Sequence, residues 1–316
     1  MMVELAAQVA QVAMVLCLAP GLTGLVRLTK ARLVGRRGAS LLQPYRDLAR
    51  LLRKDALVAE NASWLFRSAP YLVFTVVWFT ASLVPTFTTG ILLGPTADLI
   101  ALTAFLGSAR FFTALAALDI GTSFGGIGSS REMMIGSLAE PAMLMMIFTV
   151  SLLVRSTSLV DVAEILATGE LGIRVSLLMA AVALVMVAIA ENARIPIDNP
   201  STHLELTMVH EAMVLEYSGR HLALMEAAAM VKLLLYISLI GCLFIPFGIG
   251  SRAEGISGFG LGLATYLLKL AAGGVALGVF ETSIAKMRVF RIGEFLGGAL
   301  LLGLLAMVYL YISRAM

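Results

Sequence analysis

Long apolar stretches without a charged residue recur throughout this 316-residue chain. Each has close to the ~20 residues that a helix needs to cross a bilayer. Their apolar residues are consecutive rather than alternating, which favours helices over a membrane β-barrel. Because 59% of all residues are hydrophobic and only 14% are charged, one soluble core could not bury the chain. We therefore predict an all-α polytopic membrane protein.

We expect eight transmembrane helices within a single membrane domain covering 1–316. The predicted spans are 3–26, 70–92, 98–118, 133–154, 174–191, 227–249, 259–281 and 295–313. The N-terminus lacks a basic region and a convincing cleavage site, so it is read as the first span rather than as a signal peptide.

The lysines and arginines outside these spans are distributed unequally between the two sides. Segment 27–69 carries ten, and the other three segments on the same side bring that side to 16, against four on the opposite side. Membrane proteins keep such residues in cytoplasmic loops. The bias predicts that the large polar segments, 27–69 and 191–226, face the cytoplasm as docking segments.

Within the first docking segment, residues 41–54 are predicted to form an amphipathic helix along the cytoplasmic interface. Its apolar side would carry Leu41, Tyr45, Leu48 and Leu52, opposite arginines. Two interpretations stay open: arginines that reach lipid phosphates, or a surface for a soluble partner.

Charged residues inside spans are expensive and therefore point to function. Glu140 lies in the fourth span beside Pro141, with Arg110 of the third span as a candidate counter-ion. Lys232 and Lys269 are further candidates. The alternative for Glu140 and Arg110 is a structural ion pair, and for the lysines it is snorkelling.

The second docking segment begins with "ENARIPIDNPSTHLELTMVHEAMVLEYSGRH", 191–221, which holds all three histidines and five of the 20 acidic residues. Glu191 and Arg194 are spaced to pair across a helical turn. Two prolines then fix a rigid piece that carries Asp198. Thr202 and Glu205 form a capping-box pattern, which predicts a helix ending at Gly219 with Glu205 and Glu216 on one face.

The chain shows no nucleotide-binding, nucleophile-elbow or zinc-protease motif. The glycine-rich stretch 119–132 is read as a flexible cytoplasmic loop. Cys17 and Cys242 lie singly in apolar runs, and the spacing of His203 and His210 is too wide for adjacent metal ligands. We expect no cofactor in this chain.

Three segments resemble the membrane protein family shared by respiratory complex I, where it is subunit 1, and membrane-bound [NiFe] hydrogenases. "RRGASLLQPYRDLARLL" (36–52) follows the first span, as the family's own segment does. "GSSREMMIGSLAEP" (128–141) is similar to the hydrogenase branch of the formate hydrogenlyase subunit 4 type. "ENARIPIDNP" (191–200) and "EYSG" (216–219) match the family's acidic signature.

The departures from the signature favour the hydrogenase branch. Quinone-reducing members carry three glutamates after the Pro-Phe-Asp motif, whereas Ser201 and His203 replace two of them here, leaving Glu205. Ile197 stands where the family usually has Phe, and Ala39 where it has Pro.

The resemblance implies a component of a prokaryotic inner-membrane complex. It would lie beneath two soluble subunits, [NiFe]-hydrogenase-like large and small subunits, which would hold the metals and iron–sulfur centres. Antiporter-like membrane subunits would be neighbours, and buried charges would link electron transfer to proton or sodium movement. The ion-coupling or interface candidates are Glu140, Glu191, Arg194, Asp198, Glu205, Glu211, Glu216, Arg110, Arg131 and Lys269. The docking candidates are Arg36, Arg37, Asp47 and Tyr217.

Three other functions stay open at this stage. The first is a quinone-site subunit of complex I, against which the missing glutamates count. The second is a stand-alone secondary transporter, which is expected to show an internal repeat with paired broken helices that this sequence lacks. The third is a purely structural anchor.

Overall fold

The fold is described from a computed structural model, which places residues 2–168, 174–198, 208–250, 255–285, 287 and 291–315. Within these ranges the regular structure is helical, apart from two isolated β-bridges, Thr88 with Gly250 and Asp98 with Ser158. The all-helical prediction therefore holds for the described part of the chain.

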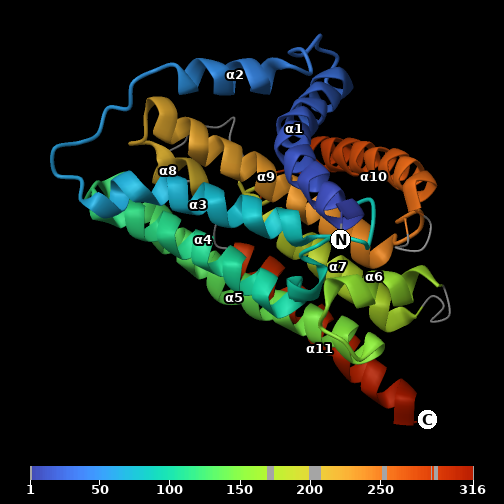
Figure 1. Ribbon diagram of the computed structural model, residues 1–316. Coiled ribbons are helices and arrows are strands. Elements are labelled where there is room, and N and C mark those ends of the chain that lie inside the picture. Colours follow the sequence, from blue (N-terminus) through green and yellow to red (C-terminus); the bar gives the residue numbers. More distant parts are fainter. Residues whose placement is uncertain are drawn as a thin grey trace.

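The helices follow one another along the chain and are shown in Figure 1. They are α1 (Met2–Leu33), α2 (Gln43–Leu52), α3 (Trp64–Leu83), the 3₁₀ turn η1 (Gly94–Thr96), α4 (Leu99–Asp119), α5 (Ser123–Val154), α6 (Leu159–Ala167), α7 (Val175–Glu191), α8 (His210–Val214), α9 (Gly219–Phe244), α10 (Gly255–Ser283) and α11 (Ile292–Ala315).

Helices occupy all eight predicted span ranges, at least in part. Six of the helices in the described ranges are long and apolar enough to cross a membrane by length and composition: α1, α4, α5, α9, α10 and α11. The protein is therefore a polytopic membrane protein. Helix α7 is apolar but only 17 residues long, and α3 ends early, so the number of eight spans stays a prediction.

The predicted second span, 70–92, is wrong in its last third, because α3 ends at Leu83. Val84 precedes Pro85 and takes an extended conformation, as the steric bulk of proline requires of the residue before it. Residues 84–91 are buried although they form no helix.

The glycine-rich stretch 119–132 is not a flexible loop, because α5 begins at Ser123, capped by the side chain of Thr122. Its glycines permit close approach instead. A Cβ at Gly125 would collide with the carbonyl oxygen of Ala117, and one at Gly128 would lie 3.0 Å from Met213. Glycine was here a sign of packing rather than of mobility.

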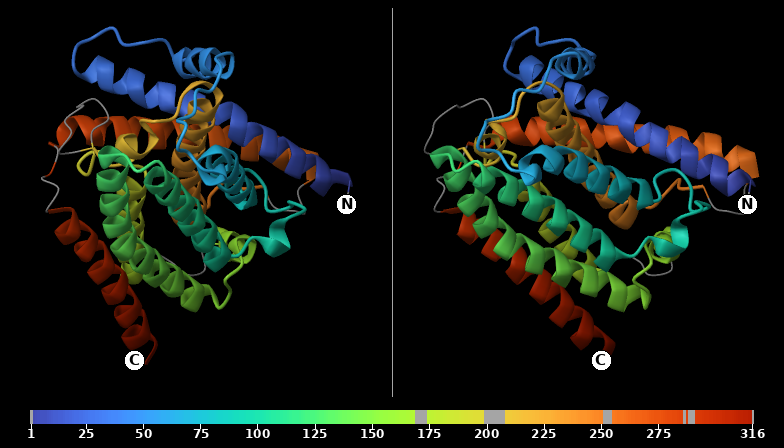
Figure 2. Two further views of the ribbon diagram at one scale, coloured as in Figure 1. Left: turned by 90° about the vertical axis from the view of Figure 1, so that its left-hand side faces the viewer. Right: turned by 60° about the vertical axis from the view of Figure 1, so that its left-hand side comes forward.

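The helices form a bundle in which α5 packs against α4, α7 and α11, while α3 packs against α4 and α9. Helices α1 and α10 lie side by side along another face, as both views in Figure 2 show. The outer faces of α10 and α11 expose large apolar side chains, including Leu261, Leu268 and Leu301, as expected for contact with lipid.

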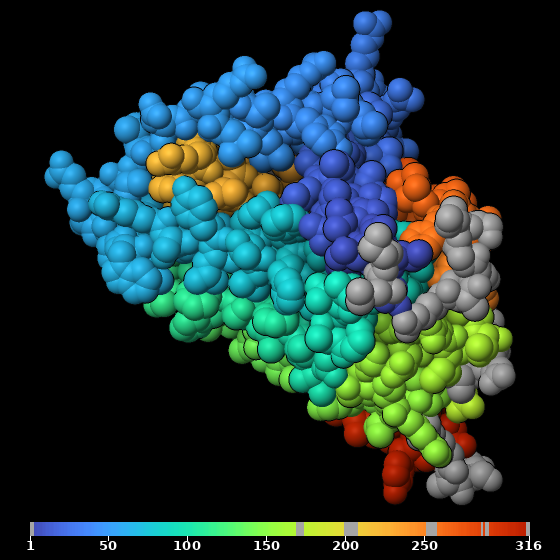
Figure 3. Space-filling view, viewed as in Figure 1, coloured from blue at the N-terminus to red at the C-terminus, as the bar shows by residue number. Residues whose placement is uncertain are grey.

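Helix α2 lies across one end of the bundle, over α9 and the end of α1 (Figures 1 and 3). It begins near Pro44, whose ring suits the first helical turn. Of the predicted apolar positions, Tyr45 and Leu48 are half-buried against the bundle, whereas Leu41 and Leu52 are exposed. The Tyr45 hydroxyl donates to the Cys17 carbonyl on α1.

Candidate ion-coupling site

Arg110, in the C-terminal half of α4, is the centre of a largely buried charge cluster. Its guanidinium meets the carboxylates of three glutamates: Glu140 at 2.9 Å, Glu132 at 3.6 Å, and Glu191, which it contacts directly. The side chain of Arg110 is only 4% exposed. The predicted pairing of Arg110 with Glu140 is therefore present, but within a larger cluster.

One face of α5 is shaped to receive this arginine. Glu132, Gly136 and Glu140 recur every four residues, so they line the same side of the helix. A Cβ at Gly136 would collide with Nη1 of Arg110, so only glycine leaves room for the guanidinium between the two glutamates. On α4, a Cβ added at Gly107 would lie 3.1 Å from Oε1 of Glu140, a tight contact.

Glu191, the last residue of α7, joins a second cation to the cluster. Its other carboxylate oxygen lies 2.9 Å from Nζ of Lys232 on α9, and its side chain is only 2% exposed. These four helices thus bring together three carboxylates and two cations. With all five groups charged, the cluster carries one net negative charge, which one proton would neutralise.

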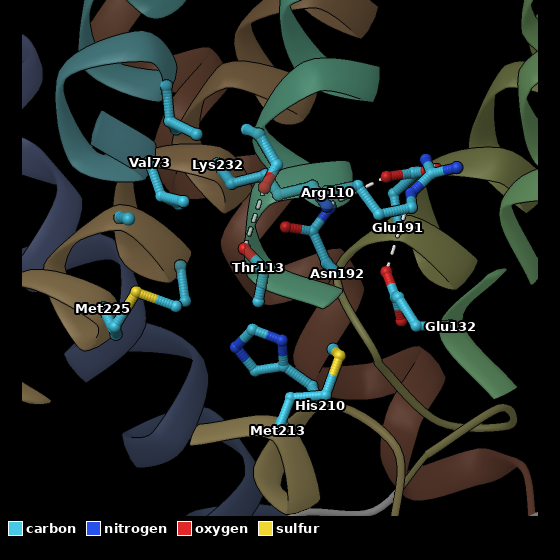
Figure 4. A pocket seen from close by; sticks show the side chains of 14 residues that line it. Val73, Arg110, Thr113, Glu132, Glu191, Asn192, His210, Met213, Met225 and Lys232 are labelled. Atoms are coloured by element: carbon cyan, nitrogen blue, oxygen red, sulfur yellow. Dashed lines mark hydrogen bonds and ion pairs between the residues drawn. The ribbon is translucent and has the colours of Figure 1, made fainter. Parts of the chain in front are cut away.

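A cavity of about 60 Å³ lies beside the cluster and is drawn in Figure 4. Arg110, Glu132, Glu191 and Lys232 contribute to its wall, together with His210 of α8. A single water needs roughly 10–15 Å³, so the cavity has room for several. Waters there would connect carboxylates that do not touch, which is what proton transfer between them needs.

His210 brings a neutral, titratable ring to this cavity. Burial lowers its pKa, Lys232 lowers it further, and Glu132 and Asp198 oppose that effect. The imidazole is therefore uncharged near neutral pH, with both a donor and an acceptor nitrogen.

The predicted Glu191–Arg194 pair is wrong. After α7 the chain turns through Ala193, which has a φ of +47°, and Glu191 and Arg194 form ion pairs with different partners. Arg194 lies 3.6 Å from Glu281 on α10, and Glu281 also lies 2.6 Å from Lys30 on α1. Burial lowers the pKa of Arg194, and Glu281 opposes that shift. The result is a second ion cluster that ties the turn after α7 to the α1–α10 pair.

Asp198 and Arg131 hold the chain that leads into α8. A carboxylate oxygen of Asp198 accepts from the backbone N–H of Val209 at 3.1 Å. Nη1 of Arg131 donates to the carbonyl of Met208 at 2.8 Å. Both predicted residues therefore position the cavity wall, while Glu211 is half-buried on α8 itself.

The "EYSG" signature clamps the two docking segments together. The Tyr217 ring stacks on Phe66 with centroids 4.0 Å apart, and its hydroxyl donates to the Phe66 carbonyl. The Ser218 hydroxyl accepts from the N–H of Leu57 and donates to its carbonyl, at 2.8 and 2.9 Å. Gly219 has a φ of +52° and lies against the backbone of Asp55.

This clamp corrects the predicted helix ending at Gly219. In the described residues α8 ends at Val214, and Gly219 is the first residue of α9. Tyr217 and Ser218 occupy the break because their side chains bond to the first docking segment. Thr202, His203 and Glu205 lie outside the described residues.

The remaining candidates do not join the cluster. Glu216 is exposed next to the clamp, and Arg36 and Arg37 are exposed before α2. Asp47 accepts hydrogen bonds within α2, from Gln43 and Arg50. Lys269 lies on α10, facing a different pocket.

Sequence reasoning missed Glu132 and Glu281. Glu132 stands eight residues before Glu140, a spacing that marks a shared helical face, but it had been assigned to a loop. Glu281 closes the predicted seventh span, and no local pattern in the sequence pairs it with Lys30, 251 positions earlier. No group of three or more His, Cys, Asp or Glu suited to a metal occurs among the residues that were placed.

Comparison with known proteins agrees with the family resemblance. The sequence model of the NADH dehydrogenase family matches residues 6–312. Formate hydrogenlyase subunit 4 of Escherichia coli (strain K12) is 32% identical over 281 residues, covering 88% of this chain and 90% of the relative. Hydrogenase-4 component C of the same organism is 32% identical over 285 residues, covering 90% and 88%.

A solved structure shares the fold. One chain of the membrane-bound sulfane sulfur reductase, an archaeal respiratory membrane complex, superposes with a TM-score of 0.82. The match covers 96% of this chain and 98% of that chain, at 15% sequence identity. At that identity the likeness shows the fold alone.

Proposed function

Because this chain belongs to the NADH dehydrogenase family, we propose that it is the membrane-embedded coupling subunit of a hydrogenase- or formate hydrogenlyase-type complex. The two E. coli relatives are named for such complexes, and each is matched over nearly its full length. The chain would anchor a soluble [NiFe]-hydrogenase-like module, which holds the metal centres, and would link its reaction to proton or sodium movement.

The Arg110 cluster carries this proposal. Four helices bring together three carboxylates and two cations, of which only Glu140 is substantially exposed, beside a cavity with room for water. Such groups are costly inside a membrane and mark ion pathways. A purely structural anchor does not need a third carboxylate in addition to the two that the two cations neutralise.

The proposed docking surface lies at the end of the bundle that α2 covers. Helix α2 and the basic residues around it, including the exposed Arg36 and Arg37, cover the end nearest the cluster. We assign this end to the cytoplasmic side of a prokaryotic inner membrane, from the bias in Lys and Arg. The soluble module would bind here, and the clamp at Tyr217 and Ser218 would connect its position to α8 and the cavity.

Glu140 is the residue of the cluster that a neighbouring subunit could contact. Its side chain is 46% exposed although it lies within α5, whereas the Arg110 side chain is 4% exposed. Lipid cannot solvate a carboxylate, so a further membrane subunit of the antiporter-like type is the expected cover.

The test uses sealed vesicles that contain the whole complex, with hydrogen production and ion transport measured together. Glu140→Gln and Glu191→Gln are expected to reduce ions moved per hydrogen at least tenfold while hydrogen production continues. Glu164→Gln, an exposed carboxylate on α6, is the matched control. Unchanged transport in both cluster variants would leave only an anchor, and quinone reduction by a complex without nickel would contradict the hydrogenase assignment.

A further inference from the structure

A second polar region lies at the end of the bundle opposite α2, where α3 breaks off. Residues 84–91 are buried but not helical. In a membrane, such backbone is tolerated only where protein surrounds it or where it lines a water-filled cavity. Two glutamines of α1 satisfy part of it: Gln8 and Gln11 donate to the Ser82 carbonyl at 3.1 and 3.0 Å, and Gln11 also donates to Val84.

Several polar atoms of this region are buried without a hydrogen-bond partner in the described residues. They are the hydroxyl oxygens of Thr86 and Thr89 and the side-chain oxygen of Gln11. Buried polar atoms in native proteins are nearly always paired, with protein or with ordered water. Three such atoms in one region indicate bound water.

A small pocket next to the break provides a place for that water. Its volume is about 10 Å³, close to what one water molecule needs. Thr86, Ser238, Cys242, Tyr266 and Lys269 line it. The hydroxyls of Ser238 and Tyr266 lie 3.0 Å apart, so a water between them and Thr86 would find several partners.

Among the described residues that line this pocket (the Lys269 pocket), Lys269 alone is charged. It stands midway along α10, as far from Gly255 as from Ser283, and therefore near the middle of that span. Among the residues that were placed, it forms no ion pair, in contrast to Lys30 and Lys232. An unpaired ammonium at this depth is a functional feature by default.

An apolar layer separates this pocket from the Arg110 cluster. Helix α9 reaches both, with Lys232 in the cluster and Ser238 in the pocket, six residues or about 9 Å apart along the axis. The intervening residues 233–237 are three leucines, Tyr236 and Ile237, and all except the half-buried Ile237 are almost fully buried. The two polar regions are therefore distinct sites.

We infer that Lys269 is a proton-exchange site that communicates with the outer face of the membrane through water held by Thr86, Ser238 and Tyr266. A proton leaves Nζ for the pocket water and passes outward, leaving a neutral amine. Uptake is the reverse, and no electrons move. The charge of the ammonium excludes a metal cation from the same pocket. This inference rests on the proposed function, because it supplies the outer end of an ion path.

The experiment compares Lys269→Gln and Lys269→Arg in vesicles that contain the whole complex. Arginine keeps the charge but cannot release its proton. We therefore expect both variants to lose at least tenfold in ions moved per hydrogen, with hydrogen production retained. Full transport by the arginine variant would show that only the charge matters and would overturn the inference. Arg155→Gln, at an exposed position outside both docking segments, is the control.

Two milder variants keep the test decisive if Lys269 variants do not assemble. Thr86→Val and Tyr266→Phe each remove one hydroxyl at nearly constant volume, and each is expected to slow transport severalfold. Transport by the wild type should respond to pH on the outer side, and this response should weaken in both variants. Unchanged transport and pH response would contradict the inference.

Running Glu140→Gln in parallel separates the two proposals. If Glu140→Gln loses ion transport while all variants of the Lys269 pocket transport normally, this inference is overturned and the proposed function is supported. Normal transport in every variant would contradict both.

Discussion

Two polar regions of this protein, the Arg110 cluster and the region around residues 84–91, accommodate buried polar groups in different ways. The Arg110 cluster contains full charges, each within reach of an opposite charge. The region around residues 84–91 contains hydroxyls and amides, a broken helix and one lysine that has no charged partner among the described residues. A membrane bundle can therefore bury polar groups either by pairing them or by leaving room for water.

The difference predicts unequal tolerance to the loss of a cation, and this is the largest effect expected. Arg110→Met would leave three carboxylates around an uncompensated site, so we expect a loss of about 3–5 kcal/mol in the free energy of unfolding. Lys269→Met removes a cation that pairs with no described carboxylate, and we expect a much smaller change. Thermal unfolding of the two purified variants in detergent measures the contrast, and equal losses would contradict it.

A single methyl group would disturb the packing of the cluster. In Gly136→Ala the new Cβ would collide with Arg110, so the guanidinium has to leave Glu140 or α5 has to shift. Overpacking of this kind costs about 1–3 kcal/mol. We expect a lower melting temperature and slower ion transport.

The matched control for that substitution lies on the same helix. A Cβ at Gly126 would meet nothing within 4 Å, so Gly126→Ala should be neutral or slightly stabilising. Equal behaviour of the two alanine variants would mean that Arg110 does not need the space.

The clamp connects the start of α9, the helix that carries Lys232 of the cluster, to the chain before α3. Ser218→Ala removes both hydrogen bonds to Leu57, which should cost about 1–2 kcal/mol. Binding of the soluble module, measured by copurification, should weaken as well. Ser130→Ala is the control, because Ser130 is exposed and bonds only within its own helix. Normal binding of the module by Ser218→Ala would show that the clamp does not contribute to the docking surface.

The smallest expected effect is a pH dependence of the cluster alone. Burial lowers the pKa of His210 below its usual 6.5, so the unfolded chain binds a proton there before the folded chain does. Stability from this group is present above pH 6.5 and is lost as the pH falls below that value. Glu132 on α5, Lys232 on α9 and Asp198 before α8 face the ring and modulate the shift.

Melting temperatures between pH 7.5 and 5.5 test this prediction. The wild type should lose more over this range than His210→Gln, which cannot titrate. Identical slopes would show that acid acts elsewhere. Variants of the Lys269 pocket should keep the wild-type dependence of melting temperature on pH.

The class of structure and several site residues could be predicted from local patterns in the sequence. Uninterrupted apolar runs can be satisfied only by helices in a bilayer, and a charge inside such a run, as at Glu140 and Arg110, must find a partner. The bias in Lys and Arg places α2 and the clamp on the cytoplasmic side, and this sidedness stays a prediction.

Which charges pair with one another depends on how the helices pack, and no local pattern predicted it. Glu191 was expected to pair with Arg194, three residues away, but the turn at Ala193 sends the two side chains to different clusters. Glu281 and Lys30 come together because α1 and α10 pack side by side. Likewise, the break at Pro85 becomes a polar pocket only because α9 and α10 bring Ser238, Tyr266 and Lys269 to it. Local patterns specify helices and their ends, whereas long-range packing, which no local pattern encodes, decides which buried charges are neutralised.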